Sequence, residues 1–293
     1  MPHAHGAFVT LAALALLCAQ GCVGRADVPR AAASTPEPPP PSAAPAQTPA
    51  PPPYPAQKRG DEAFEPFISL GGGRRFESRE VERKPARKDL KVGADYPVLV
   101  GDRSAAAREF NRRARSFVLG EVTPYLEPGR DLEKEKDPFW KDVEEFYNVR
   151  HRVVFAAGDV VSVLFYLEGY NWGAGHSYHQ PVTFNFDLKS GREIKLAHLF
   201  NPRSDYLRRI AGLCGEDLRR QFGTNFPFFT DGLKPTAKNF KSWVITPGGL
   251  VFIFEEYQLV AYAQGEPKVL IPFDSLKEII EPRGALARLA AHE

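Results

Sequence analysis

Polar side chains that are able to do chemistry gather between residues 168 and 198. They are Glu168, Tyr170, Asn171, His176, Tyr178, His179, Asp187 and His198. His176 and His179 stand three residues apart, as in some zinc sites, and Asp187 or His198 would then supply the third ligand. Without a metal, the same side chains would contact a ligand through hydrogen bonds and aromatic surface.

The loop over residues 171–180 allows three interpretations. It is a metal site, a turn whose glycines supply unusual backbone angles, or a ligand contact carried on a rigid sheet. No HExxH motif or cysteine pair supports the metal site. We therefore predict a ligand-binding loop with no metal, no cofactor and no catalytic residue. Its binding residues would be Asn171, Trp172, His176, Tyr178 and His179.

Acidic side chains next to aromatic ones are a second candidate for chemistry. Glu255 and Glu256 precede Tyr257, and the segment 121–147 mixes acidic and aromatic residues. Glycoside hydrolysis needs two carboxylates about 5 to 10 Å apart, which neighbours in sequence do not establish. Exposed aromatic residues in 121–147 would suit contact with a protein or a sugar, or they would fill a core.

Hairpins and two amphipathic helices would position these residues. Apolar residues at helical spacing predict helices over 105–119 and 205–222. Runs of β-branched and aromatic residues between turn signals predict strands over 150–157, 160–170, 181–188, 193–196, 242–246, 250–254, 260–263 and 268–271. The expected fold class is α+β, with antiparallel sheets built from hairpins and each covered by a helix.

Three smaller features complete this prediction. Residues 74–91 mix basic and acidic side chains, which is typical of a solvated edge strand. Ser275 and Glu278 form a capping box that predicts a short helix over 275–281. Cys214 lies in the apolar stripe of the second helix, so we expect a buried small side chain and not a nucleophile.

Several short motifs in the C-terminal half occur together. They are GAGH at residues 173–176, NFDLKSGR at 185–192, LAHLF at 196–200 and GLVFIFEEY at 249–257. In this order they resemble the domain-of-unknown-function family 3298. Upstream, residues 96–99 (YPVL) and the helix that carries Phe110 and Asn111 are similar to the companion family 4163.

This resemblance implies a domain organisation and a kind of ligand. Residues 61–148 would form an N-terminal α+β subdomain like family 4163, and residues 149–293 a C-terminal α+β domain like family 3298. The pair of families occurs in a peptidoglycan deacetylase. It also forms the extracellular part of a lysozyme-responsive anti-sigma factor, where it binds lysozyme. The implied ligand is thus a lysozyme-like protein or a cell-wall glycan.

The first 22 residues indicate the cell envelope. Residues 8–17 are an apolar run of about ten residues, which is too short to cross a bilayer, and small residues follow it as in a cleaved export signal. Gly21 before Cys22 is the spacing at which a lipoprotein signal peptidase leaves a lipidated cysteine. We expect Cys22 to carry a lipid anchor, with simple secretion or an uncleaved membrane anchor as the alternatives. Residues 23–60 are proline-rich and would form an extended spacer.

The overall charge and the expected lipid anchor limit which kinds of partner this protein can bind. Because 38 basic residues face 36 acidic ones, no global field attracts nucleic acid. We predict a periplasmic or outer-membrane lipoprotein that touches the membrane through its lipid and binds a protein or peptidoglycan ligand without catalysis. One alternative is a metal-dependent cell-wall hydrolase or deacetylase accessory using His176 and His179. The other is an envelope scaffold without a discrete site.

Overall fold

The computed structural model describes residues 65–85, 90–126, 144–171, 173–223, 226 and 230–290, all within one compact unit, Pro52–Glu293. The expected export signal, the lipidation site Cys22 and the spacer lie outside the described residues. The same is true of Trp172 and of 127–143 in the aromatic segment. Within the described ranges, no helix is both long enough and apolar enough to span a membrane.

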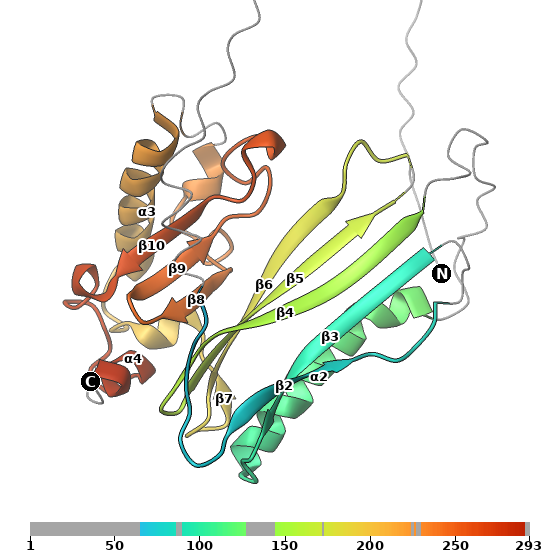
Figure 1. The fold of residues 1–293 in the computed structure, drawn as a ribbon. Coiled ribbons are helices and arrows are strands. Elements are labelled where there is room, and N and C mark those ends of the chain that lie inside the picture. Colours follow the sequence, from blue (N-terminus) through green and yellow to red (C-terminus); the bar gives the residue numbers. More distant parts are fainter. Residues whose placement is uncertain are drawn as a thin grey trace, which may run out of the picture. The chain divides into compact units, whose positions relative to one another are not determined.

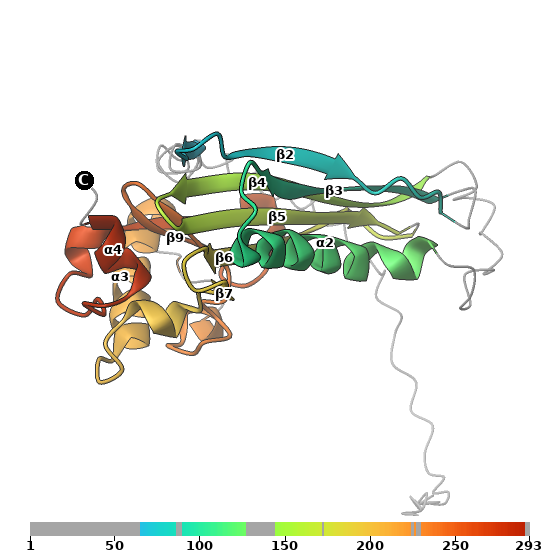
Figure 2. The ribbon, with the colours of Figure 1, turned by 90° about the horizontal axis from the view of Figure 1, so that it is seen from below.

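Seven strands form a large sheet. They are β1 (Phe67–Ser69), β2 (Arg75–Glu80), β3 (Leu90–Val100), β4 (Glu145–Ala157), β5 (Val160–Tyr170), β6 (Tyr178–Asp187) and β7 (Arg192–Glu193). Their order is β2-β3-β4-β5-β6-β7, and β1 pairs with the C-terminal end of β4. Helix α2 (Ala105–Leu126) follows β3 and lies along one face of this sheet (Figures 1 and 2).

The apolar spacing of α2 explains why it lies on the sheet. Ala107, Phe110, Ala114, Val118 and Val122 recur every three or four positions and are all buried, in one core with residues of β4, β5 and β6. The hydroxyl of Ser104 accepts a hydrogen bond from the N–H of Ala107 (3.1 Å), so Ser104 is the N-cap of this helix. The helix runs beyond the expected end at residue 119 because Val122 continues the buried stripe.

A second sheet of three strands has its own helix. The strands are β8 (Trp243–Thr246), β9 (Gly249–Ile253) and β10 (Lys268–Pro272), in the order β10-β9-β8. Helix α3 (Tyr206–Phe222) packs its buried stripe, which includes Ile210, Cys214 and Leu218, into the core of this sheet (Figure 1). The prediction for Cys214 is confirmed, since the free thiol is fully buried and burial raises its pKa.

Short helices connect the remaining parts. They are η2 (Leu196–Leu199), η4 (Thr230–Leu233), η5 (Tyr262–Gln264), η6 (Phe273–Ser275) and α4 (Ala285–Ala290). The strand expected over 193–196 is reduced to β7, which ends at Glu193 before η2 begins at Leu196. Two further local predictions are wrong. Residues 260–263 are not a strand, because Gly265 at φ 72° closes the single turn of η5. Residues 275–281 are not a helix, because their backbone instead bonds to 199–201 through the bridge between Phe200 and Ile280.

The predicted α+β class with hairpin-built sheets, each covered by a helix, is confirmed. Two pairings are parallel, β1 with β4 and β3 with β4, and α2 supplies the long connection that the second one needs. The solvated edge strand expected within residues 74–91 corresponds to β2, which lies at the edge of the large sheet and is mostly exposed. The boundary expected between residues 148 and 149 falls within β4, which pairs with β3 and β5 there, and the division into two domains stays a prediction.

Buried polar groups attach the small sheet to the face of the large sheet that is opposite α2. The N–H of Ile245 donates to the hydroxyl of Ser162 (3.0 Å), and this hydroxyl donates to the side-chain carbonyl of Asn185. The amide nitrogen of Asn185 then donates to the carbonyl of Trp243 (2.9 Å). Because Ser162 is on β5 and Asn185 on β6, this network fixes how β8 lies on both strands.

Candidate functional site

Strand β6 sends the two neighbours Tyr178 and His179 to opposite faces of the large sheet. In the register with β5, Tyr178 is opposite Gly169 and His179 is opposite Glu168. The Tyr178 ring lies so close over Gly169 that a Cβ there would come within 2.5 Å of its hydroxyl. Burial, with a hydrogen bond to Tyr125 of α2, raises the pKa of Tyr178. Tyr178 therefore belongs to the α2 face and does not share a site with His179.

His179 is held between carboxylates. Its Nδ1 lies 2.7 Å from Oε1 of Glu256, its Nε2 lies 3.6 Å from Oε1 of Glu168, and its backbone N–H donates to Glu256 (3.3 Å). Partial burial opposes the charged imidazole. The hydrogen bond to Glu256 and the charges of Glu256, Glu168 and Glu266 outweigh that effect, so the pKa of His179 is raised.

His176 contacts two tyrosines. Its ring stacks on Tyr262 at a centroid distance of 3.6 Å and an interplanar angle of 20°. Nδ1 lies 2.7 Å from the carbonyl oxygen of Ser177, so Nδ1 carries a proton and donates it. Nε2 lies 3.1 Å from the hydroxyl of Tyr257, which donates to it when the imidazole is neutral.

We call His176, Tyr257 and Tyr262 the aromatic platform. Tyr257 is 51% exposed, and its φ of 61° is the single positive value among the described residues other than glycine. A bulky side chain in this left-handed region is rare and strained. The platform thus presents an exposed ring on a backbone that the surrounding contacts hold in an unfavourable conformation.

Glu266 adds a half-buried carboxylate, with a buried Oε1 atom, near His179 and Glu256. Burial, and less strongly the charges of Glu256 and Glu255, raise the pKa of Glu266 against the opposing charges of Lys268 and His179. Within the described ranges its Oε1 has no hydrogen-bond partner. The same part of the chain contains no group of three or more His, Cys, Asp or Glu side chains that could hold a metal ion.

Part of this site lies in a segment that matches a known protein family. Residues 197–274 match the family model described as "Protein of unknown function (DUF3298)". These residues belong to the DUF3298 family. The DUF3298 segment supplies Glu256, Tyr257, Tyr262 and Glu266, whereas His176 and His179 precede it. The companion domain at residues 61–148 stays a prediction.

Similar proteins extend the comparison beyond the DUF3298 segment. The chain is 22% identical over 196 residues to "Peptidoglycan-N-acetylmuramic acid deacetylase PdaC" of Bacillus subtilis. This alignment covers 66% of this chain and 40% of that protein. The chain therefore spans less than half the length of this relative. A crystal structure of a DUF3298 family member from Bacteroides fragilis shares the fold, with a TM-score of 0.57, 16% identity, and coverage of 72% of this chain and 94% of that one.

The residues that sequence reasoning singled out do not form one cluster. Asn171 is exposed at the end of β5, where its carbonyl accepts from the N–H of Ala174 (3.0 Å). Asp187 accepts from Arg288 (2.8 Å), and Nδ1 of His198 accepts from the N–H of Lys195 (3.3 Å). His179 and Asp187 are eight residues apart on one strand, roughly 26 Å at about 3.3 Å per residue. The convergence that the metal-dependent alternative requires is therefore not found among the described residues.

The structure also adds residues that the sequence did not point to. Tyr262 and Glu266 reach the loop only because η5 and the start of β10 fold back beside it. Glu256 and Tyr257 stood out in the sequence as an acidic–aromatic neighbourhood, but nothing in it linked them to His176 and His179. The signal that could have suggested them is the Glu-Glu-Tyr string at the end of a motif shared with the family.

The raised pKa of His179 predicts a pH dependence of stability. A histidine in an unfolded chain titrates near pH 6.5, so protonated His179 stabilises the folded state fully below about that pH. This contribution is lost as the pH rises through the higher folded-state pKa. We expect the melting temperature of the wild type to exceed that of His179→Gln by more at about pH 5.5 than at about pH 9. Thermal unfolding of both proteins measures the difference, and a pH-independent gap would contradict the ion pair.

Proposed function

We propose that this chain is a non-enzymatic binding module of the bacterial cell envelope, and that its aromatic platform binds a cell-wall glycan. The observation that carries the proposal is Tyr257, an exposed ring on a strained backbone, stabilised by His176 and Tyr262. Strain of this kind persists only where the surrounding structure enforces it, and it clusters at ligand sites.

The chemistry around the platform suits a sugar. The face of a tyrosine ring offers apolar surface for the C–H face of a pyranose, and its hydroxyl remains available for hydrogen bonding. Glu168 lies close to His179 and is part-exposed, with 40% of its side chain accessible, so its oxygens can accept hydrogen bonds from sugar hydroxyls. A site with one aromatic surface and a few placed polar groups is the usual pattern for small polar ligands.

The relative named above supports the envelope location. By its name, PdaC acts on peptidoglycan, and the present chain shares 196 aligned residues with it. We propose that this shared part meets the same polymer, while the deacetylase activity of the whole relative is not carried over. In the same proposal Cys22 is the lipid anchor, and the spacer 23–60 holds the module up to roughly 100 Å from the membrane.

The direct test is the loss of binding in Tyr257→Asn. Asparagine tolerates a positive φ, so this variant should keep the fold while it removes the ring. We expect its affinity for muropeptide oligosaccharides, measured by calorimetry on the full chain, to fall at least about tenfold. Tyr257→Phe is the matched control and should retain most of the affinity, because the ring remains.

Two outcomes would change the proposal. Equal affinity of the wild type and Tyr257→Asn for the oligosaccharides would show that the platform is not the glycan site. Saturable binding of lysozyme, lost in Tyr257→Asn while the oligosaccharides give no heat, would replace the glycan by a protein ligand at the same surface.

A further inference from the structure

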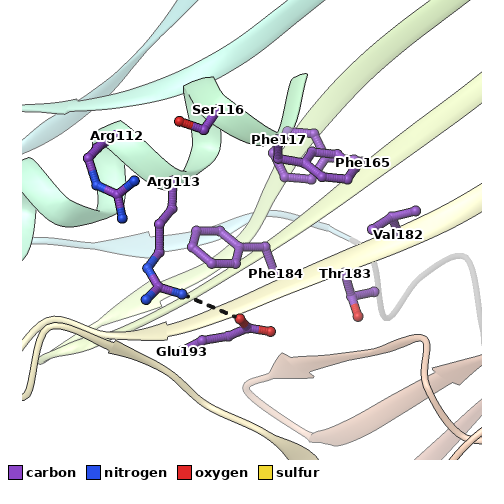
Figure 3. A pocket seen from close by; sticks show the side chains of 9 residues that line it. All are labelled: Arg112, Arg113, Ser116, Phe117, Phe165, Val182, Thr183, Phe184 and Glu193. Carbon is purple, nitrogen blue, oxygen red and sulfur yellow. Dashed lines mark ion pairs between the residues drawn. The ribbon is translucent and has the colours of Figure 1, made fainter. Parts of the chain in front are cut away.

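A cleft separates α2 from β6 on the face of the large sheet that lacks the aromatic platform. Its volume is about 310 Å³, and Phe117, Phe165 and Phe184 form its apolar wall. Arg113 of α2 and Glu193 of β7 lie at one end, as Figure 3 shows. We call this space the α2–β6 groove. Its size is at the lower end of the range for ligand pockets.

The groove reaches an unpaired part of a strand edge. The carbonyl of Asn185 accepts from the N–H of Ile194 (2.8 Å), so Asn185 turns its backbone groups toward the outer edge of β6. Every second residue of a strand does the same, which places the N–H and C=O of Thr183 on that edge. In the described part of the chain β7 pairs only with Phe186 and Asp187, and no strand pairs with Thr183 on this side.

At the polar end of the groove, the guanidinium of Arg113 has N–H groups that can donate to a further partner. Nε of Arg113 donates to Glu109 (2.7 Å), but Nη1 is 3.7 Å from Oε2 of Glu193, which is beyond hydrogen-bond distance. The first part of α2, residues 105–116, carries four arginines against one glutamate. Two of these arginines, Arg112 and Arg113, line the groove together with Glu193, and the Nη groups of Arg113 can donate to a carboxylate.

We propose that the α2–β6 groove binds a short extended peptide that ends in an apolar residue and a free carboxylate. A peptide bond would pair with Thr183 and add a strand to the sheet edge. Because paired residues point to the same face, the residue opposite Thr183 would point toward Trp243, whose N–H donates to the Thr183 hydroxyl (3.2 Å), and must be small. Its neighbours would point into the phenylalanine-lined cleft, and the carboxylate would bind Arg113.

The probes for this proposal are three tripeptides, fluorescein-labelled at the N-terminus, with alanine in the middle and valine, leucine or phenylalanine on both sides. Fluorescence anisotropy with the full chain should show saturable binding of at least one of these peptides. The same peptide with an amidated C-terminus should bind at least about tenfold more weakly. Arg113→Gln should lose a similar factor. Ser116→Trp, at an exposed position of α2 that borders the groove, should abolish binding by filling it.

Controls separate this result from misfolding and from the glycan proposal. Arg115→Gln, on the same helix but outside the groove, should bind as the wild type does. Glu193→Gln should bind the carboxylate form more tightly, because it removes the competing charge, and a damaged fold would not do this. Tyr257→Asn should leave peptide binding unchanged. Absence of binding by all three peptides, or equal binding by the wild type, Arg113→Gln and Ser116→Trp, would overturn the proposal.

Discussion

Replacing Phe110 by alanine is expected to lower the free energy of unfolding by about 3–5 kcal/mol. Phe110 has no exposed surface, and its ring centroid lies 5.8 Å from Phe76, 5.6 Å from Phe184 and 5.6 Å from Phe186. Phe76 is on β2 and the other two are on β6, four positions away in the sheet order. A flat sheet would separate these strands by about 19 Å at about 4.8 Å per strand. The sheet must therefore curve around α2, with Phe110 at the centre.

This position explains why the loss should be large. A cavity left by the ring borders two strands that approach Phe110 from different sides, so neither can collapse into it without leaving the other. Urea denaturation monitored by circular dichroism measures the change. Phe110→Leu keeps most of the volume and should cost less than half as much, and Arg115→Ala on the exposed side of α2 should cost little. A loss of less than about 1.5 kcal/mol for Phe110→Ala would contradict this account of the sheet's curvature.

Local patterns were sufficient for most elements of the fold. The turn Gly158-Asp159 fixes β4 and β5 as neighbours, and the stripe with Cys214 places α3 with its apolar side inward. The parallel pairing of β3 with β4 could not be predicted in this way. It depends on α2 returning the chain across the sheet, which is a tertiary contact and not a turn.

The site was predicted less completely than the fold. The sequence predicts a strand that begins at residue 181, which places Tyr178 and His179 together in the loop before it. Because β6 begins at Tyr178, alternation sends them to different faces. The partners of His176 and His179 lie 81 and 77 residues away, and no local pattern encodes contacts at that separation.

Replacing Asn185 by alanine is expected to lower the free energy of unfolding by about 2–4 kcal/mol and to weaken ligand binding as well. Asn185 is 3% exposed and bonds at once to Ser162 and to the carbonyl of Trp243. Its removal leaves the O–H donor of Ser162 without its acceptor, although the Ser162 oxygen still accepts from Ile245, and leaves the buried carbonyl of Trp243 without the donor that Asn185 supplies. Each such lost partner costs about 1–3 kcal/mol. Gln180→Ala, at an exposed position of the same strand, is the control and should change little.

The effect on binding follows from where the network lies. Asn185 and Ser162 fix β8, and β9, which pairs with β8, leads directly into the segment that carries Glu256 and Tyr257. Loosening this attachment moves that segment relative to His176 and His179, which come from β6 and the loop before it. We therefore expect Asn185→Ala to reduce affinity for the platform's ligand under conditions in which the protein is still folded. If urea denaturation shows the loss of stability but the remaining folded protein binds with wild-type affinity, the two halves of the platform are held together by their own contacts alone.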